Sequence, residues 1–315
     1  MAFEGSLEQK YSKQIDQESF DPIFILGDHR SGTTLLYKSL VATGCFNYVS
    51  AYHVINYDNL LTLKAQGKEH HARQELAQLF KDCNLRDRGI DHVQPTPELP
   101  EEYGFVLDNA GYGFKLSQKS LPLLLELGRK IQVISTSEKP LMLKNPWDSS
   151  NFLFIKEKFP NCRIIFIHRE ATEVINSKLK AMRVLLAKRN AYTALLSDKY
   201  SEIFSHPLKQ YFYRLYYSRL SGCGLRAIVN ETIESKLYFY ENIQSLSQTD
   251  YISITYEELC RNPRKTILDI LQFLGLEQIE PLDFENLIKP RPHKLLPEVA
   301  RLKDKILQKL NHGGS

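Results

Sequence analysis

Hydrophobic residues along the chain gather in short continuous runs, separated by longer stretches in which apolar positions recur with a helical period. The runs that are typical of buried strands lie at 24–26, 140–145, 162–169 and 251–256. Helical spacing covers 32–43, 59–82 with an interruption at Gly67, 121–133, 148–159, 170–186 and 262–273. Continuous apolar strands that alternate with helices are typical of a parallel sheet buried on both faces. The pattern therefore predicts an α/β fold with a central parallel sheet flanked by helices.

The segments outside this alternation also have recognisable patterns. Residues 48–57 are aromatic and lack a clear period, whereas 84–104 hold three prolines and predict a long loop, which we interpret as a lid on the acceptor side. Residues 207–246 are rich in tyrosine, and we expect their aromatic rings to pack in the core. We predict one domain over 1–315, with an N-terminal arm at 1–20 and a tail or linker at 311–315.

Composition and charge exclude several classes of function. Hydrophobic residues make up 43% and charged residues 25% of the 315 residues, and 41 basic against 37 acidic side chains leave a net charge of +4. This balance does not favour nucleic acid as a partner. The five cysteines are scattered without a C-x-x-C pair, which predicts neither a disulfide framework nor a metal site. No leader pattern and no apolar run of membrane-spanning length occur, so we expect a cytoplasmic protein without a membrane partner.

The most informative stretch follows the first apolar run. Residues 27–34 read Gly-Asp-His-Arg-Ser-Gly-Thr-Thr and lead into a helical pattern. A loop of this kind at a helix N-terminus offers unpaired backbone N–H groups to an anion. Thr33 stands where the lysine of a nucleotide-triphosphatase P-loop would be, and the cation of this loop is Arg30. The loop therefore favours a ligand whose 5′ end is not a triphosphate.

Two other predicted strands end in a cation as well. Lys144 closes the run at 140–145, and Arg169 closes the run at 162–169. Because the functional sites of parallel α/β sheets lie at the carboxyl ends of the strands, we expect Arg30, Lys144 and Arg169 to meet at one site.

This ordered set of motifs resembles the sulfotransferases that use 3′-phosphoadenosine 5′-phosphosulfate. Residues 30–34 are similar to the 5′-phosphosulfate loop of that family, and 166–170 to its 3′-phosphate motif, with Ser177 eight positions beyond Arg169. Residues 256–259 and the Asn-Pro pair at 262–263 are similar to the C-terminal half of the family. The resemblance covers about residues 22 to 276 and implies a P-loop-like sulfotransferase fold.

The resemblance also implies roles for individual residues. Arg169 and Ser177 would hold the 3′-phosphate, while Arg30 and Lys144 would stabilise the leaving phosphate, with 3′,5′-adenosine bisphosphate as product and no metal required. The implied donor-binding residues are Arg30, Ser31, Gly32, Thr33, Thr34, Arg169, Ser177 and Tyr256.

The general base is the least determined part of the prediction. Cytosolic members of the family carry a histidine two residues after the strand-end lysine, a position that Pro146 occupies here. Golgi-type members use a glutamate in an aromatic stretch after the phosphosulfate helix, and His53 lies in the similar stretch. We predict that His53 accepts the proton, with Asp58 and His92 as alternatives.

The predicted reaction transfers a sulfuryl group to a hydroxyl, or as second choice an amine, of a soluble small molecule such as a secondary metabolite. Two other functions fit parts of the sequence: a nucleoside or small-molecule kinase with a degenerate P-loop, and a nucleotide-binding scaffold without catalysis. Against the kinase stand the missing loop lysine and the absence of a recognisable Mg²⁺-binding aspartate in the sequence. The sequence carries no signal for an oligomeric state.

Overall fold

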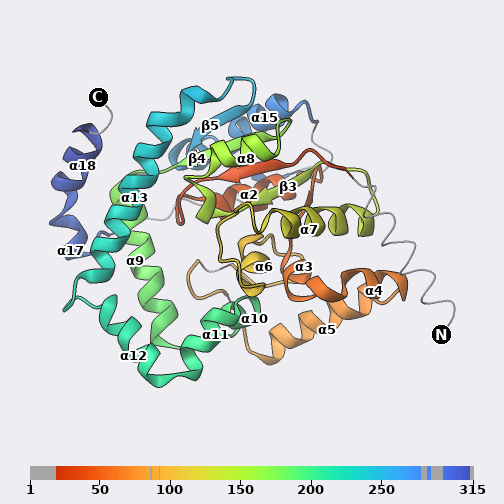
Figure 1. Ribbon diagram of the computed structural model, residues 1–315, viewed down its shortest axis with the longest axis horizontal. Coiled ribbons are helices and arrows are strands. Elements are labelled where there is room, and N and C mark those ends of the chain that lie inside the picture. The colour runs from red at the N-terminus through yellow and green to blue at the C-terminus, as the bar shows by residue number, and fades with distance from the viewer. Residues whose placement is uncertain (1–18, 86, 92, 278–281, 285–293, 313–315) are drawn as a thin grey trace.

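A computed structural model of the chain describes residues 19–85, 87–91, 93–277, 282–284 and 294–312 (Figure 1). Its centre is a five-stranded sheet in the order β2-β3-β1-β4-β5 in which every neighbouring pair is parallel. The strands are β1 (Ile23–Leu26), β2 (Asn47–Tyr48), β3 (Leu141–Lys144), β4 (Arg163–His168) and β5 (Tyr251–Thr255). The predicted α/β fold with a central parallel sheet is confirmed.

The two faces of the sheet bury different side chains of the same strands. Phe24 and Leu26 of β1 belong to the core beneath α7 (Leu121–Ile134) and α8 (Phe152–Lys158). Ile25 belongs to the core on the opposite face, beneath α2 (Thr33–Val41) and α15 (Pro263–Leu274). Successive side chains of a strand point to opposite faces, so a strand covered on both sides must be apolar throughout. This explains why the strands of this chain read as continuous apolar runs.

A third core lies beside the sheet. It joins α9 (Ala171–Ala187) to α13 (Cys223–Asn242) and to the C-terminal helices α17 (Pro297–Ala300) and α18 (Lys303–His312), through residues such as Ile175, Ile228 and Val299. In Figure 1 these helices form the left side of the molecule. The other α-helices are α3 (Ala51–Ile55), α4 (Leu60–Ala65), α5 (Glu69–Asp82), α6 (Gly104–Asn109), α10 (Ala191–Leu196), α11 (Asp198–Ser205), α12 (Pro207–Tyr216) and α14 (Tyr256–Arg261). Short 3-10 turns cover Tyr57–Asn59, Pro146–Asp148 and Ile243–Ser245.

The structure confirms one local prediction and corrects two others. The break at Gly67 is confirmed, because this residue adopts a left-handed φ of 64° between α4 and α5. The stretch at 48–57, which we expected to be irregular, contains α3. The expectation that the aromatic residues of 207–246 pack in the core is wrong for α12, whose Tyr211 and Phe212 are exposed.

Other expectations concern the ends of the chain and the membrane. The predicted arm at 1–20 and the tail at 311–315 lie largely outside the described residues. Among the helices that the structure describes, none combines the length and the hydropathy needed to cross a bilayer.

Candidate active site

The loop that follows β1 is shaped by two left-handed residues. Arg30 has a φ of 73° and Gly32 a φ of 105°, and the Ser31 amide donates a hydrogen bond of 3.0 Å to the Asp28 carbonyl. Left-handed residues in a tight loop turn successive N–H groups toward one point, and α2 begins directly afterwards at Thr33. The backbone therefore forms an anion-binding nest at the carboxyl end of β1.

Gly32 is required for more than its backbone angle. A Cβ atom on Gly32 would lie 2.5 Å from Cδ2 of Tyr256, which is far inside van der Waals contact. The same Tyr256 ring faces the Arg169 guanidinium at 4.3 Å, a cation–π contact. Nη1 of Arg169 donates a hydrogen bond of 3.2 Å to the Arg30 carbonyl. Residues that follow β1, β4 and β5 are thus joined in one contact network.

Ser177 lies at this site, but its hydrogen bond is to Arg30. Nε of Arg30 donates to Oγ of Ser177 at 3.1 Å, and Nη2 donates to the Ile90 carbonyl at 3.0 Å. Ser177 belongs to α9, two turns after Arg169. The structure therefore brings Arg30, Arg169 and Ser177 together, as the sequence predicted, with Arg30 between the loop and α9.

Lys144, at the end of β3, is completely buried. Its Nζ donates to Oγ1 of Thr34 at 3.1 Å and to Oε1 of Glu102 at 2.5 Å. A buried ammonium group is tolerated only when it is paired and hydrogen-bonded. Lys144 in turn holds the pKa of Glu102 below its usual range despite the burial of this carboxyl. Lys144 thus connects the start of α2 to an ionised carboxylate.

Sequence reasoning missed Glu102. It lies in the predicted lid at 84–104, among prolines and charged residues that form no motif. The one usable signal is indirect, because a lysine at the end of a fully apolar strand needs a carboxylate partner. That signal does not say which of the many carboxylates of the chain is the partner.

Glu101, the neighbour of Glu102, is in a different protonation state. It accepts hydrogen bonds from the hydroxyl of Tyr192 at 2.6 Å and from Nη1 of Arg88 at 2.8 Å. Burial, together with the charge of Glu102, raises the pKa of Glu101 to about 8. At neutral pH the two adjacent carboxyl groups therefore differ: Glu102 is ionised and Glu101 is largely protonated.

Part of this network lines one cavity of about 430 Å³, which we call the loop cavity. Its polar lining includes Arg30, Thr33, Thr34, Glu101 and Glu102, whereas Lys144 and Arg169 do not belong to the lining. Its apolar lining includes Phe105, Phe114, Trp147, Met182, Leu185 and Leu196. Phe114 and Trp147 stack with ring centroids 4.2 Å apart. The cavity thus joins an anion nest and charged groups to an aromatic and aliphatic wall.

The structure does not bring His53 to the loop cavity. Its Nδ1 accepts a hydrogen bond of 3.1 Å from the Ser50 amide, while Ser50 caps the start of α3, an arrangement known as a capping box. Its ring borders a separate cavity with Ser50, Lys64 and Arg73. Burial lowers the pKa of His53 to about 3. The geometry accounts for His53 as a helix-capping residue.

The two alternatives to His53 are not brought to the loop cavity either. Asp58 is exposed in a 3-10 turn and does not border this cavity, and His92 lies outside the described residues. His29, which sequence reasoning left aside, does line the loop cavity, with its ring 4.4 Å from that of Trp147. Burial, followed by the charge of Lys178, lowers the pKa of His29 to about 3. His29 is therefore neutral at physiological pH.

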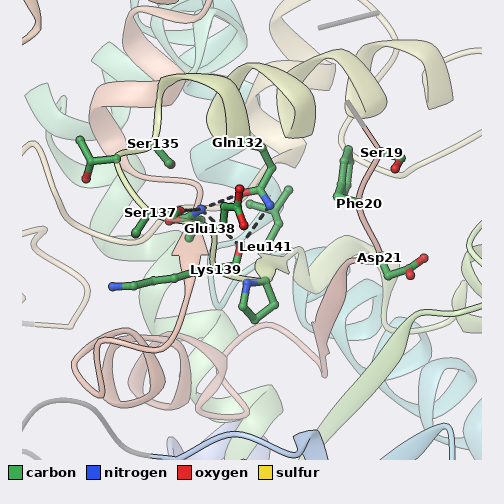
Figure 2. A pocket seen from close by; sticks show the side chains of 12 residues that line it. Ser19, Phe20, Asp21, Gln132, Ser135, Ser137, Glu138, Lys139 and Leu141 are labelled. Atoms are coloured by element: carbon green, nitrogen blue, oxygen red, sulfur yellow. Dashed lines mark hydrogen bonds between the residues drawn. The ribbon is translucent and has the colours of Figure 1, made fainter. Parts of the chain in front are cut away.

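A second and larger cavity, of about 660 Å³, lies at the opposite ends of the strands (Figure 2). Asp21 precedes β1, Asn47 begins β2 and Leu141 begins β3, so this cavity is at the amino ends. The Asn47 amide donates to Oε1 of Gln132 at 2.7 Å and to the Ser137 carbonyl at 3.1 Å. Its polar groups bond to one another, and the residues singled out by their motifs lie elsewhere.

Polar atoms around the backbone nest are suited to a phosphorylated ligand. Within the described part of the chain, Oγ of Ser31 and Nε of Arg169 are buried and have no hydrogen-bond partner. Buried polar groups are nearly always hydrogen-bonded, and a hydroxyl and a guanidinium beside an N–H nest are suitable donors for phosphate oxygens. The described ranges contain no group of three or more histidine, cysteine or carboxylate side chains that could hold a metal ion.

Comparison with known proteins agrees with this geometry. A model of the sulfotransferase family matches residues 22–281. Among solved structures, the chain is similar to sulfotransferase STF1 from Mycobacterium tuberculosis, with a TM-score of 0.60 and 15% identity over 98% of this chain and 81% of that one. It is also similar to sulfotransferase STF9 from Mycobacterium avium, with a TM-score of 0.58 and 15% identity over 90% and 71%. No curated protein matches it in sequence.

Proposed function

Because the chain belongs to the sulfotransferase family, and is therefore an enzyme of the sulfotransferase type, we propose that it transfers a sulfuryl group from 3′-phosphoadenosine 5′-phosphosulfate to a hydroxyl of a small molecule. An amine is the second choice of acceptor. The observation that carries this proposal is the chain of contacts from Thr34 through Lys144 to Glu102, beside a loop that lacks the lysine of nucleotide triphosphatases.

Donor binding is assigned to the residues around the nest. The amides of residues 32–34 and the hydroxyls of Ser31, Thr33 and Thr34 would hold the 5′-phosphate at the start of α2. Arg169 and Ser177 would hold the 3′-phosphate, and Tyr256 would support this end by fixing the Arg169 guanidinium. In support, Ser31 and Arg169 are among the residues of the described chain whose buried donors have no hydrogen-bond partner.

Bond breaking develops negative charge on the oxygen that leaves with the 5′-phosphate. The acceptor oxygen forms a bond to sulfur while the bond from sulfur to the bridging oxygen breaks, and 3′,5′-adenosine bisphosphate departs. Arg30 and Lys144 would stabilise this charge by electrostatic interaction with the leaving oxygen. Lys144 already contacts Thr34, so its position does not require a rearrangement of the loop.

The acceptor must lose a proton as it attacks. We propose Glu102 for this step in place of His53, because Glu102 lines the loop cavity and is ionised at neutral pH. Lys144, which contacts both Glu102 and Thr34, connects this carboxylate to the start of α2. His53 is turned away into its capping box. Glu101 would remain protonated and act as a hydrogen-bond donor toward the same space.

The wall of the cavity indicates the class of acceptor. Stacked Phe114 and Trp147 and the aliphatic Met182 and Leu185 favour a carbon-rich molecule that places a single hydroxyl at Glu102. A volume of about 430 Å³ suits a small molecule. A secondary metabolite with an aromatic or aliphatic body fits these properties.

Thermal unfolding in the presence of nucleotides tests the donor. We expect 3′,5′-adenosine bisphosphate to raise the Tm more than adenosine 5′-phosphate does, because only the former carries a 3′-phosphate for Arg169. The Arg169→Ala variant should lose this difference while its response to adenosine 5′-phosphate is retained. Stabilisation by ATP with Mg²⁺ alone would contradict the proposal and favour a kinase. Mass detection of an added sulfo group on a panel of apolar alcohols and phenols then tests the transfer itself.

A further inference from the structure

Helix α12 presents its apolar residues to solvent. Leu208, Phe212 and Leu215 are spaced to share one face of the helix, and their side chains are 75%, 64% and 39% exposed. Tyr211, at 61%, lies beside them, and among the ten described residues of α12 none is buried. A surface helix normally turns such a face toward the core. In Figure 1, α12 forms the lower left corner of the molecule, away from the sheet.

The polar side of α12 is the side that holds the helix to the protein. Nε of Arg214 donates to the Leu186 carbonyl at 2.7 Å, and Nη2 donates to the Ala187 carbonyl at 2.8 Å. These carbonyls lie at the C-terminal end of α9, where a cation is favoured by the helix dipole. The orientation of α12 is therefore fixed by hydrogen bonds, and its apolar face is held outward.

The chain around α12 is also rich in cations. Nine lysines and arginines but only two carboxylates occur between residues 180 and 226, whereas the whole chain has 41 and 37. Lys188 and Arg189 are exposed directly after α9, next to the carbonyls that bind Arg214. The rest of the chain is thus slightly acidic. Four of the nine cations form ion pairs with carboxylates, namely Arg183, Lys199, Lys209 and Arg219. We therefore take Lys188 and Arg189 as the cations that flank the exposed apolar helix.

A partner for this surface must accept apolar side chains and carry negative charge. In contrast to the expectation of no membrane partner from the sequence, we propose that α12 and its basic flanks dock on the surface of an anionic lipid bilayer, with Leu208, Phe212 and Leu215 inserted among the headgroups. Basic helices with aromatic and leucine residues on one face bind membrane interfaces in this way. A second copy of the chain is disfavoured, because a two-fold contact through α12 would place the same cations opposite one another.

The docked orientation has a consequence for the loop cavity. Tyr217 follows α12 directly and lines the cavity, as do Met182 and Leu185 of α9. A membrane beneath α12 would therefore lie next to the apolar wall of the cavity. The docking proposal itself rests on α12 and its charges, and it does not depend on the donor or the reaction.

Cosedimentation with vesicles tests this proposal. We expect the full chain to bind vesicles of phosphatidylcholine with about a third phosphatidylglycerol, and to bind pure phosphatidylcholine at least about tenfold more weakly. The Leu208→Ser/Phe212→Ser variant should lose about tenfold or more of the binding to anionic vesicles. Leu79→Ser/Leu268→Ser is the matched control, because both leucines are 40% exposed on helices elsewhere, and it should bind like the wild type.

Two further measurements test the contribution of charge to vesicle binding and the folding of each variant. Lys188→Gln/Arg189→Gln should weaken binding to anionic vesicles, and added salt should reduce the difference between this variant and the wild type. The Tm of each variant, measured without lipid, reports whether it is folded. Equal vesicle binding by wild type and a folded Leu208→Ser/Phe212→Ser variant would overturn the proposal. A dimer seen by light scattering that this variant abolishes, without vesicle binding, would overturn it in favour of a second copy.

Discussion

The candidate active site is built from two regions that differ in how their residues are held. In the region that we assign to the donor, Arg30, Lys144 and Arg169 lie at or just beyond the carboxyl ends of the neighbouring strands β1, β3 and β4. The register of these strands therefore sets the positions of their backbones. In the other region, Glu101 and Glu102 lie in a segment of irregular backbone, where Arg88 donates a hydrogen bond to Glu101 and Lys144 forms an ion pair with Glu102. The first region is positioned by the register of the sheet. The second is positioned by isolated backbone hydrogen bonds, such as that from the Glu101 amide to the Val49 carbonyl at 2.9 Å, together with its charged side-chain partners. Substitutions of charged residues should therefore affect the two regions unequally.

The largest effect is expected for Lys144→Met. This change leaves Glu102 buried without its cation, which should reduce the free energy of unfolding by about 3 to 5 kcal/mol. It also removes one of the two cations at the leaving oxygen, so kcat should fall by about 10²- to 10³-fold. Chemical denaturation and a turnover assay measure the two losses. In the double variant Lys144→Met/Glu102→Gln the stability should largely return while the activity stays low, and a double variant as unstable as Lys144→Met would contradict the pairing.

The second largest effect is a loss of kcat that we expect for a substitution of Glu102 but not of Glu101. Glu102→Gln keeps the shape of the side chain but removes the proposed proton acceptor, so kcat should fall by about 10²-fold with little change in the KM for the donor. Glu101→Gln is the matched control, because Glu101 is already largely protonated at neutral pH. Its kcat should stay within about threefold of the wild type. Equal losses in the two variants would mean that the carboxyl groups act as one unit.

The pH dependence of the Tm should reveal the protonation state of Glu101 in the folded protein. The pKa of Glu101 is raised to about 8 in the folded protein from an unfolded value of 4.5, so protonation favours the folded state. This contribution is fully present below pH 4.5 and is lost as the pH rises toward about 8 and beyond. The Tm of the wild type should therefore fall more steeply over this range than that of Glu101→Gln. Parallel curves would show that Glu101 is ionised throughout.

The smallest effect concerns His53. His53→Ala removes the side-chain half of the capping box at α3 and should cost about 1 kcal/mol of stability, with kcat unchanged in the folded protein. His53→Gln can still accept the hydrogen bond from the Ser50 amide and should remain closer to the wild type. A large loss of kcat in folded His53→Ala would restore His53 as the candidate base.

The same contrast explains how far the sequence could be read. The sheet and its cation-bearing strand ends were predictable, because a strand buried on both faces must be apolar and the first residues beyond it are functional in parallel sheets. Glu102 was not predictable, since its pairing with Lys144 joins residues 42 positions apart through side chains alone. The capping contact of His53 was not predicted for a local reason: a histidine three residues after Ser50 can serve as a cap, and the aromatic stretch concealed the short helix α3. The outward face of α12 was missed because periodicity shows that a helix is amphipathic but not which way it turns.

The contact between Gly32 and Tyr256 has a consequence for the order in which the site can form during synthesis. The nest lies near the beginning of the chain, yet the ring against it belongs to a residue that leaves the ribosome more than 220 positions later. Contacts of such long sequence separation form late in folding, because closing the intervening chain costs conformational entropy. A nascent chain that stops before β5 would carry the complete loop sequence and still lack the side chain that fixes Arg169. The phosphate nest is encoded first, and its supporting ring is synthesised near the end.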